Sequence, residues 1–350
     1  MKTRETAATQ PMSLAFEVSV TAVRDLSPNF RRITFGGYSL RGFGVHGDTL
    51  DLRIKLLIPS LAPDGTQLPL PAFNTSQAGW YRDWLAMDPD VRGAMRTYTV
   101  REARLDAVYP EIDVDFALHG NHRGLPREAS GPAANWALNA KPGDALTIIG
   151  PNNRAAHCVT AETYSGIEWR PGLAQRILLA GDETAVPAIA AILETLPPYM
   201  SGHALLEVQQ PADFLELSSP ADIEITWLAR GAAIGRSRPH GQLLQEAVRD
   251  AVPVLGWVGI TADDGGAGPE PEDVNVDVDI LWETPARMEA AAITAARNPQ
   301  LPAGAMPFYA WIAGEAAAIR DLRRYLVREV GIDRKQVAFM GYWRQGKAEG

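Results

Sequence analysis

Apolar and polar residues alternate along much of the first half of the chain. Apolar side chains occupy every second position over 52–58 and again over 112–118. A period of two places these side chains on one face of a strand, so both segments predict strands with one buried face. Residues 1–153 are therefore expected to form a barrel or sandwich domain. Shorter strands are predicted at 14–22, 30–36, 97–101 and 145–149, and a short helix around Trp80 to Met87.

The second half of the chain has a different pattern. From 176 to 181 the chain is apolar after its first residue, as a parallel strand covered on both faces requires. Apolar residues at helical spacing over 189–196 predict the next element as a helix, with Thr184 as its N-cap. This alternation predicts a doubly wound parallel sheet over 170–350. Further strands are predicted at 204–209, 223–228 and 307–313, and further helices at 241–250, 284–297 and 315–330.

Two segments interrupt these patterns. The first, about 59–95, is rich in Pro, Gly and Asp, and the second, about 252–306, contains an acidic run with many glycines at 261–277. Such composition favours surface loops or linkers over packed elements. We expect both segments to be insertions, one in each domain.

Composition narrows the possible functions. The net charge of −9 repels phosphate backbones, so no nucleic-acid partner is expected. The single cysteine, Cys158, cannot form an internal disulfide or by itself hold a metal, and no protein metal site is expected. Because the chain has neither an apolar signal region nor a run of about 20 apolar residues, we expect a soluble cytoplasmic protein without stable membrane insertion. We also expect a monomer.

The segment Arg96-Thr97-Tyr98-Thr99 begins a predicted strand in the first half. Alternation places Arg96 and Tyr98 on one face and the two threonines on the other. The first face offers a guanidinium for a pyrophosphate and a ring for packing. A solvated edge strand would fit the same pattern.

A second candidate follows the alternating strand that ends at His119-Gly120. Gly131-Pro132-Ala133-Ala134 precedes Trp136 and opens a short predicted helix. The backbone N–H groups and the positive dipole end of such a helix suit a diphosphate. The alternative is a helix that only turns a corner of the barrel.

Two turns of the second half share one expected edge of the sheet. Gly181-Asp182-Glu183-Thr184-Ala185 follows the first parallel strand, and Gly314-Glu315 follows a later one. Doubly wound sheets bind ligands at the carboxyl ends of their strands, so the two turns predict a cleft, although neither is a G-x-G-x-x-G fingerprint. Near the end of the chain, the aromatic residues of Tyr342-Trp343-Arg344 either pack against a flat cofactor or close the core.

Taken in order, these segments resemble the siderophore-interacting protein family, FAD-dependent ferric-siderophore reductases of the ferredoxin–NADP reductase superfamily. The resemblance covers most of the chain outside the two insertions. It implies an N-terminal antiparallel FAD-binding β-barrel over 1–153 and a C-terminal nicotinamide-binding α/β domain over 170–350. The cofactor-binding residues that it implies are Arg96, Thr97, Tyr98, Thr99, His119, Gly131, Pro132, Ala133, Ala134, Trp136, Gly181, Asp182, Glu183, Thr184, Ala185, Gly314, Glu315 and Trp343.

The resemblance also implies a donor and a substrate. NADPH or NADH would bind at the Gly181 and Gly314 turns, and a 2′-phosphate would require an arginine such as Arg230, Arg236 or Arg238. Lys55 and Arg344 match the basic residues that hold an anionic ferric siderophore, although Lys55 alone fits a solvated strand face equally well. The family usually has serine at 134 and arginine at 135, where this chain has Ala134 and Asn135.

The working hypothesis is therefore flavin chemistry without a catalytic side chain. Hydride passes from the nicotinamide to the flavin, and single electrons then pass to Fe(III), which releases iron as Fe(II). Two alternatives are a different flavin oxidoreductase of the same superfamily and a protein that binds a flavin or siderophore without turnover. Turnover with free flavin would favour the first, and absence of NAD(P)H oxidation the second.

Overall fold

The computed structural model divides into two compact units. The first extends to Ile167, and the second begins at Glu168 and also includes Leu26–Asn29. The structure describes residues 10–60, 62, 66–71, 75, 77, 79–118, 131–155, 164–231, 237–254, 281–284 and 308–346.

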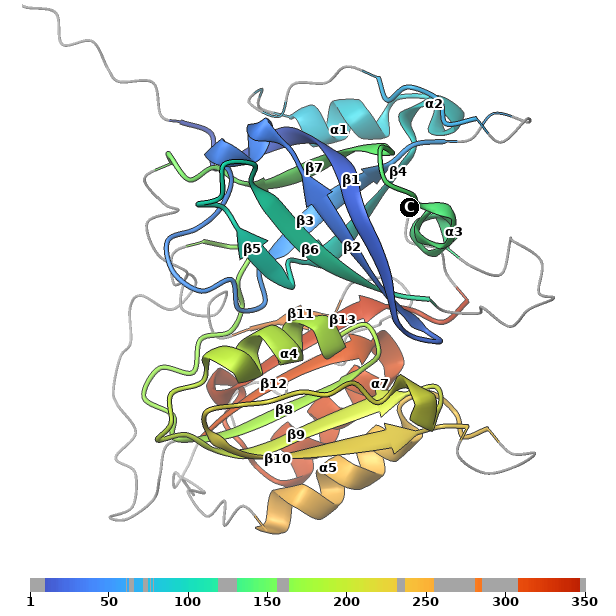
Figure 1. The fold of residues 1–350 in the computed structure, drawn as a ribbon. Coiled ribbons are helices and arrows are strands. Elements are labelled where there is room, and N and C mark those ends of the chain that lie inside the picture. The colour runs from blue at the N-terminus through green and yellow to red at the C-terminus, as the bar shows by residue number, and fades with distance from the viewer. Residues whose placement is uncertain are drawn as a thin grey trace, which may run out of the picture. The chain divides into compact units, whose positions relative to one another are not determined.

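The N-terminal unit is a seven-stranded antiparallel sheet in the order β4-β3-β7-β1-β2-β6-β5 (Figure 1). β4 pairs with β3, and β5, only two residues further along the chain, pairs with β6. The Arg101 N–H between them donates to the Asp113 carbonyl at 2.8 Å, so the chain itself joins the two edges into a barrel. The strands are β1 Ser13–Ser27, β2 Phe30–Gly36, β3 Arg53–Ile58, β4 Ala94–Thr99, β5 Glu102–Arg104, β6 Glu111–Ala117 and β7 Ala145–Pro151.

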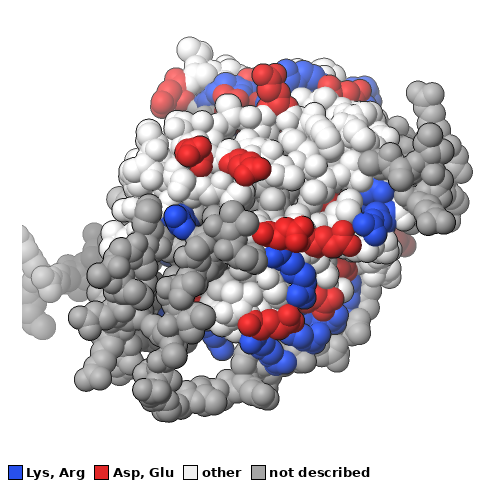
Figure 2. Space-filling model, turned by 90° about the horizontal axis from the view of Figure 1, so that it is seen from below, with Lys and Arg blue, Asp and Glu red and all other residues white. Residues whose placement is uncertain are grey.

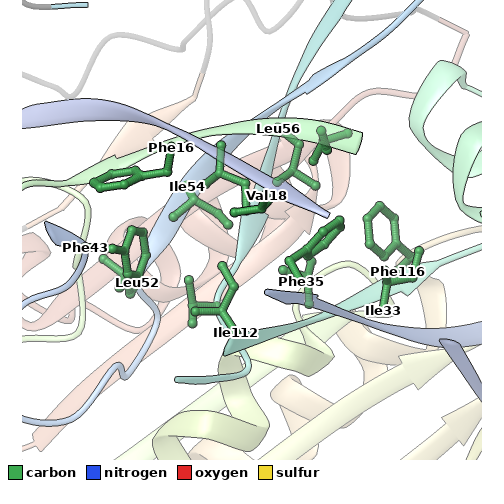
Figure 3. Close-up of a cluster of buried hydrophobic side chains, with 14 of the residues drawn as sticks. Phe16, Val18, Ile33, Phe35, Phe43, Leu52, Ile54, Leu56, Ile112 and Phe116 are labelled. Atoms are coloured by element: carbon green, nitrogen blue, oxygen red, sulfur yellow. The ribbon is translucent and has the colours of Figure 1, made fainter. Parts of the chain in front are cut away.

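The alternating residues of these strands fill the barrel. Ile54 and Leu56 from β3 meet Ile112 and Phe116 from β6 in one cluster (Figure 3), and each is at most 2% exposed. Burying a side chain of this size contributes about 1.5–3 kcal/mol. The predicted β-barrel and the inward faces of its two alternating strands are confirmed.

The segment predicted as the first insertion contains ordered helices. α1, Trp80–Leu85, confirms the short helix expected there, and α2, Pro89–Arg92, follows it. Trp84 of α1 is 1% exposed and packs with Leu57 and Met95 on the outer face of the sheet. Because these outward residues are apolar, another element must cover them, and the helical segment does so. The loop predicted over 59–95 is therefore wrong for the part that forms α1 and α2.

The C-terminal unit is a six-stranded sheet in the order β10-β9-β8-β12-β13-β11. Helix α4, Val186–Thr195, covers one face, while α5, Gln242–Val254, and α7, Ala316–Arg323, cover the other (Figure 1). Neighbouring strands are parallel except for β11, which pairs antiparallel with β13. The doubly wound sheet is thus confirmed, with one antiparallel edge strand. The strands are β8 Arg176–Asp182, β9 Ser201–Val208, β10 Asp222–Ala229, β11 Trp282–Glu283, β12 Phe308–Glu315 and β13 Val337–Trp343.

Several predicted boundaries differ from the structure. Thr184 does not cap α4: its N–H and hydroxyl bind the Asp182 Oδ1 at 2.9 and 2.5 Å, and Ala185 is the residue before the helix. The helix predicted over 315–330 is α7 followed by a π-helical turn, Arg324–Glu329. Apart from Thr284, the helix predicted at 284–297 lies outside the described residues, as does the run at 261–277. Short 3₁₀ helices occur at Tyr38–Gly42, Pro211–Asp213 and Arg334–Gln336.

Charged side chains of both signs cover the helical face around α5 and α7. The exposed ion pair Arg249–Glu329 and the half-buried pair Arg320–Asp321 lie there. In the view of Figure 2, basic and acidic side chains stand next to one another instead of forming one basic patch. Within the described parts of the chain, no helix combines the length and the apolar character needed to cross a membrane.

Candidate functional site

Strands β3 and β4 bring two of the predicted site residues together. Lys55 lies opposite Thr97 in the antiparallel register, and its Nζ donates to the Thr97 Oγ1 at 2.7 Å. Both side chains are exposed. Arg96 and Tyr98 alternate with Thr97, so they share the opposite face of β4, as the sequence predicts. An ammonium group therefore lies beside the Arg-Thr-Tyr-Thr strand.

Aromatic rings connect β4 with the short helix α3, Pro132–Asn139. The Tyr98 ring lies 4.4 Å from that of Phe116, and Phe116 lies 6.0 Å from Trp136 of α3. Burial raises the pKa of the Tyr98 hydroxyl, although Arg96 acts in the opposite direction, so the hydroxyl remains protonated at neutral pH. Helix α3 also packs against β4, the strand that carries Arg96 and Tyr98.

The N-terminus of α3 presents hydrogen-bond donors. Gly131 precedes the helix without a side-chain cap, and Pro132 occupies its first turn. Helix geometry leaves the N–H groups of Ala133 and Ala134 without intrahelical acceptors. The Trp136 Nε1 is also buried without a hydrogen-bond partner. The N–H groups of Ala133 and Ala134 fit an anionic diphosphate such as that of FAD. His119, predicted near the flavin, lies outside the described residues.

In the C-terminal unit, Asp182 joins three strand ends. Its Oδ2 accepts from the Glu315 N–H and the Trp343 Nε1, both at 2.7 Å, and its Oδ1 accepts from Thr184. Gly314 has a φ of +153°, and a Cβ there would lie 2.7 Å from the Asp182 Oδ2. Only glycine fits this approach. The predicted turns at 181–185 and 314–315 are therefore in direct contact at one sheet edge.

Glu315 also uses its carboxylate within the protein. Its Oε2 accepts from the N–H groups of Ala317 and Ala318 at 2.8 and 3.0 Å, which makes it the N-cap of α7, and its Oε1 accepts from the Gln345 N–H. Glu315 thus ties the end of β12 to the segment that follows Trp343 and Arg344. In this structure Asp182 and Glu315 shape the edge of the sheet by accepting from backbone N–H groups, and Asp182 also accepts from the side chains of Thr184 and Trp343.

Glu183 forms a buried ion cluster with two residues that come from later strands. Arg230 contacts both Glu183 oxygens, at 2.7 and 2.8 Å, and the Glu207 Oε1 at 3.2 Å. Glu207 also accepts from the N–H groups of Gly241 and Leu244. Burial disfavours the charge of Arg230, but its bonds with Glu183 and the nearby carboxylates raise its pKa, and burial raises the pKa of Glu207.

This cluster involves one of the three arginines that the sequence offers for binding a 2′-phosphate. The guanidinium of Arg230 is occupied by two carboxylates, Arg238 pairs with Glu246 at 3.3 Å, and Arg236 lies outside the described residues. Glu207 belongs to none of the motifs that the sequence presents. A charged residue within the apolar run 204–208 is the signal that points to a buried partner.

A second buried ion network covers the polar face of β6. Arg104 donates to both Asp113 oxygens, at 2.8 and 2.9 Å, and Thr34 donates to the Asp113 Oδ1. Arg32 forms the corresponding pair of bonds with Asp115, at 2.7 and 2.8 Å. Burial alone would raise the pKa of Asp113, but the bonds from Arg104 and Thr34 outweigh it and lower the pKa.

Asp113 is therefore expected to contribute stability that is lost in acid. Because its folded pKa lies below its unfolded value, this contribution is present above about pH 4 and disappears as the pH falls through the folded pKa. At pH 7, Asp113→Asn should lower the free energy of unfolding by about 1–3 kcal/mol. Thermal unfolding from pH 7 to pH 3 measures the difference, with exposed Asp106→Asn as the control. A wild-type to variant difference that does not depend on pH would contradict this assignment.

Comparison with known proteins gives the class of the chain. Family models match it in two consecutive parts: the siderophore-interacting FAD-binding domain over residues 19–155 and the siderophore-interacting protein over residues 174–346. An uncharacterized protein of Mycobacterium tuberculosis is 33% identical over 337 residues, which cover 96% of this chain and 91% of that protein. The ferric vibriobactin reductase ViuB of Vibrio cholerae is 28% identical over 324 residues, covering 93% of this chain and 87% of ViuB.

A solved structure agrees with these matches. The crystal structure of a siderophore utilization protein from T. fusca is 26% identical, with a TM-score of 0.61, and covers 97% of this chain and 95% of that one. An antiparallel FAD-binding barrel followed by a doubly wound α/β domain has the architecture of the ferredoxin–NADP reductase superfamily. The chain belongs to the siderophore-interacting protein family, which confirms the resemblance noted from its motifs.

Proposed function

We propose that the chain is an FAD-dependent reductase that takes electrons from NADPH or NADH and reduces Fe(III) in a ferric siderophore, releasing Fe(II) in the cytoplasm. The observation that supports the proposal is the packing of helix α3, whose N-terminus has no side-chain cap, against β4, the strand of Arg96 and Tyr98. It lies in a siderophore-interacting FAD-binding domain, in a chain similar to a ferric vibriobactin reductase.

In this proposal the barrel holds the flavin. Arg96 and the N–H groups of Ala133 and Ala134 hold the diphosphate by charge and by the helix dipole. Tyr98, Thr97, Thr99 and His119 bind or border the flavin, and Trp136 packs behind them. Bound FAD supplies the redox chemistry, because it accepts a hydride from a nicotinamide and can pass electrons on one at a time.

The C-terminal unit binds the nicotinamide dinucleotide at the turns 181–185 and 314–315, with Trp343 beside them. Asp182 and Glu315 act by fixing these turns, since their carboxylates are bound to protein donors. Lys55 and Arg344 attract the anionic ferric chelate. A positively charged side chain at the protein surface attracts an anionic chelate by its charge, so it does not require a binding site shaped for one particular siderophore.

The first test is the absorbance spectrum of the purified chain under anaerobic conditions. We expect a yellow protein that bleaches on addition of NADPH or NADH and recovers its colour when a ferric siderophore is added with an iron(II) trap. The nucleotide that bleaches it identifies the donor. A colourless protein that takes up no FAD would contradict the proposal, and a flavoprotein that neither nucleotide reduces would leave a binding role.

The role of Lys55 is tested separately. Lys55→Ala should raise the KM for the ferric siderophore about ten-fold, the effect of one lost charge-assisted contact, while flavin reduction by the nucleotide is unchanged. Lys141→Ala is the control, because Lys141 is an exposed lysine of the same unit that pairs with Asp144. Equal KM values for wild type and Lys55→Ala would remove Lys55 from the substrate site.

A further inference from the structure

Helix α3 is a weak element by itself. It has eight residues, and isolated helices shorter than about 12–15 residues are marginal in water. No side chain caps its N-terminus. If its first N–H groups are to receive a diphosphate, other contacts must fix the helix from its middle and its C-terminal end. The Trp136 ring, stacked on Phe35 at 6.0 Å, is the contact in the middle.

The contact at the C-terminal end is Arg31 of β2. Its Nη1 donates to the Ala137 carbonyl at 3.0 Å and to the Leu138 carbonyl at 2.7 Å. Both carbonyls belong to the last turn of α3, where helix geometry supplies no intrahelical donors. A cation at this end also interacts favourably with the helix dipole. One guanidinium group thus closes the C-terminal end of the helix.

Arg31 is itself held in place. Its Nε donates to the Asp25 Oδ1 at 2.6 Å, and its side chain is only 18% exposed. Asp25 lies on β1, so the guanidinium spans from β1 to α3. Alternation along β2 puts Arg31 on the same face as Ile33 and Phe35, the face that packs into the barrel, whereas Arg32 faces Asp115 on the other side.

We propose that Arg31 is a positioning residue for FAD: it fixes α3 from its C-terminal end so that the N–H groups of Ala133 and Ala134 point at the diphosphate. This inference rests on the proposed function, because the diphosphate site belongs to it. Arg31 does not touch the cofactor in this assignment. It acts through the orientation of the helix.

The test compares Arg31→Gln and Arg31→Lys with Arg24→Gln, an exposed arginine on β1. The FAD dissociation constant is measured by flavin fluorescence on flavin-free full-length chain. Amide hydrogen exchange of residues 131–140 is measured on the same samples and compared with that of β2 and β6. Glutamine removes the charge and the Nε–H that binds Asp25, while lysine keeps the charge but not the fork of the guanidinium.

Arg31→Gln should weaken FAD binding about ten-fold, Arg31→Lys less, and Arg24→Gln not at all. The α3 amides of Arg31→Gln should exchange faster while β2 and β6 keep their wild-type rates. Wild-type affinity in Arg31→Gln, or equal acceleration in the strands, overturns the positioning role alone. A wild-type chain that binds no FAD overturns the proposed function, and the positioning role with it.

Discussion

Arg230→Met is expected to lower the free energy of unfolding of the C-terminal unit by about 3–5 kcal/mol. Arg230, Glu183 and Glu207 are each at most 5% exposed. Removing the guanidinium leaves two buried carboxylates without their cation, while Glu207 keeps only its two backbone donors. The penalty comes from uncompensated charge, so the apolar volume of methionine does not offset it.

Urea unfolding monitored by amide hydrogen exchange of β8, β9 and β10 measures this loss in the C-terminal unit. Arg238→Met is the matched control, because Arg238 is 49% exposed and pairs with an equally exposed Glu246. Exposed pairs contribute about 0–1 kcal/mol. Equal losses of unfolding free energy in the two variants would show that the buried cluster contributes no more to stability than the exposed pair. Where Arg230→Met remains folded, its preference between NADPH and NADH should be that of the wild type, because the structure commits Arg230 to carboxylates.

Much of the fold follows from local patterns. The period of two over 52–58 and 112–118 predicts which side chains enter the barrel, because a strand has only two faces. The apolar run of β8 and the helix after it are recognisable for the same reason. The sequence pattern does not predict β13 as a strand. It leaves the aromatic residues there either to pack against a flat cofactor or to close the core, and Val337 to Met340 are fully buried between β12 and β11.

The polar contacts were less predictable, because they depend on strand order and register. Asp113 and Asp115 were expected on a polar face and are buried there, since Arg104 and Arg32 reach them from neighbouring strands. The contact between Lys55 and Thr97 likewise requires the register of β3 and β4. No sequence pattern within one element specifies such pairs.

In the candidate site, too, the positions of the turns are predictable from the sequence and their polar contacts are not. The motifs locate the turns at 181–185 and 314–315 correctly at one sheet edge, because parallel strands end on the same side. They do not reveal that Asp182 binds Thr184, Glu315 and Trp343 at once, and a carboxylate in a ligand-binding turn is more simply interpreted as a ligand group. The bonds instead indicate that Asp182 holds three segments of the chain together.

Asp182→Ala is accordingly expected to lower the free energy of unfolding of the C-terminal unit by about 3 kcal/mol or more. It leaves the buried N–H of Glu315 and the half-buried N–H of Thr184 and indole of Trp343 without their acceptor, and an unsatisfied donor costs about 1–3 kcal/mol where it is buried. Asp182→Asn should be nearly as damaging. Its amide has one carbonyl oxygen, so its NH₂ group must face the donors on one side.

The same two variants distinguish an effect on the nucleotide turns from an effect on FAD binding. Both should bind FAD with wild-type affinity and lose at least about ten-fold in the rate at which NADPH or NADH reduces the flavin, measured by anaerobic stopped-flow absorbance, because the nucleotide turns lose their shared anchor. Asp222→Asn, an exposed aspartate at the start of β10, is the control. If Asp182→Asn kept both its stability and its rate of flavin reduction, the turns would be held by β12 and β13 pairing alone. A loss of stability with an unchanged rate would instead mean that the nucleotide binds away from this edge of the sheet.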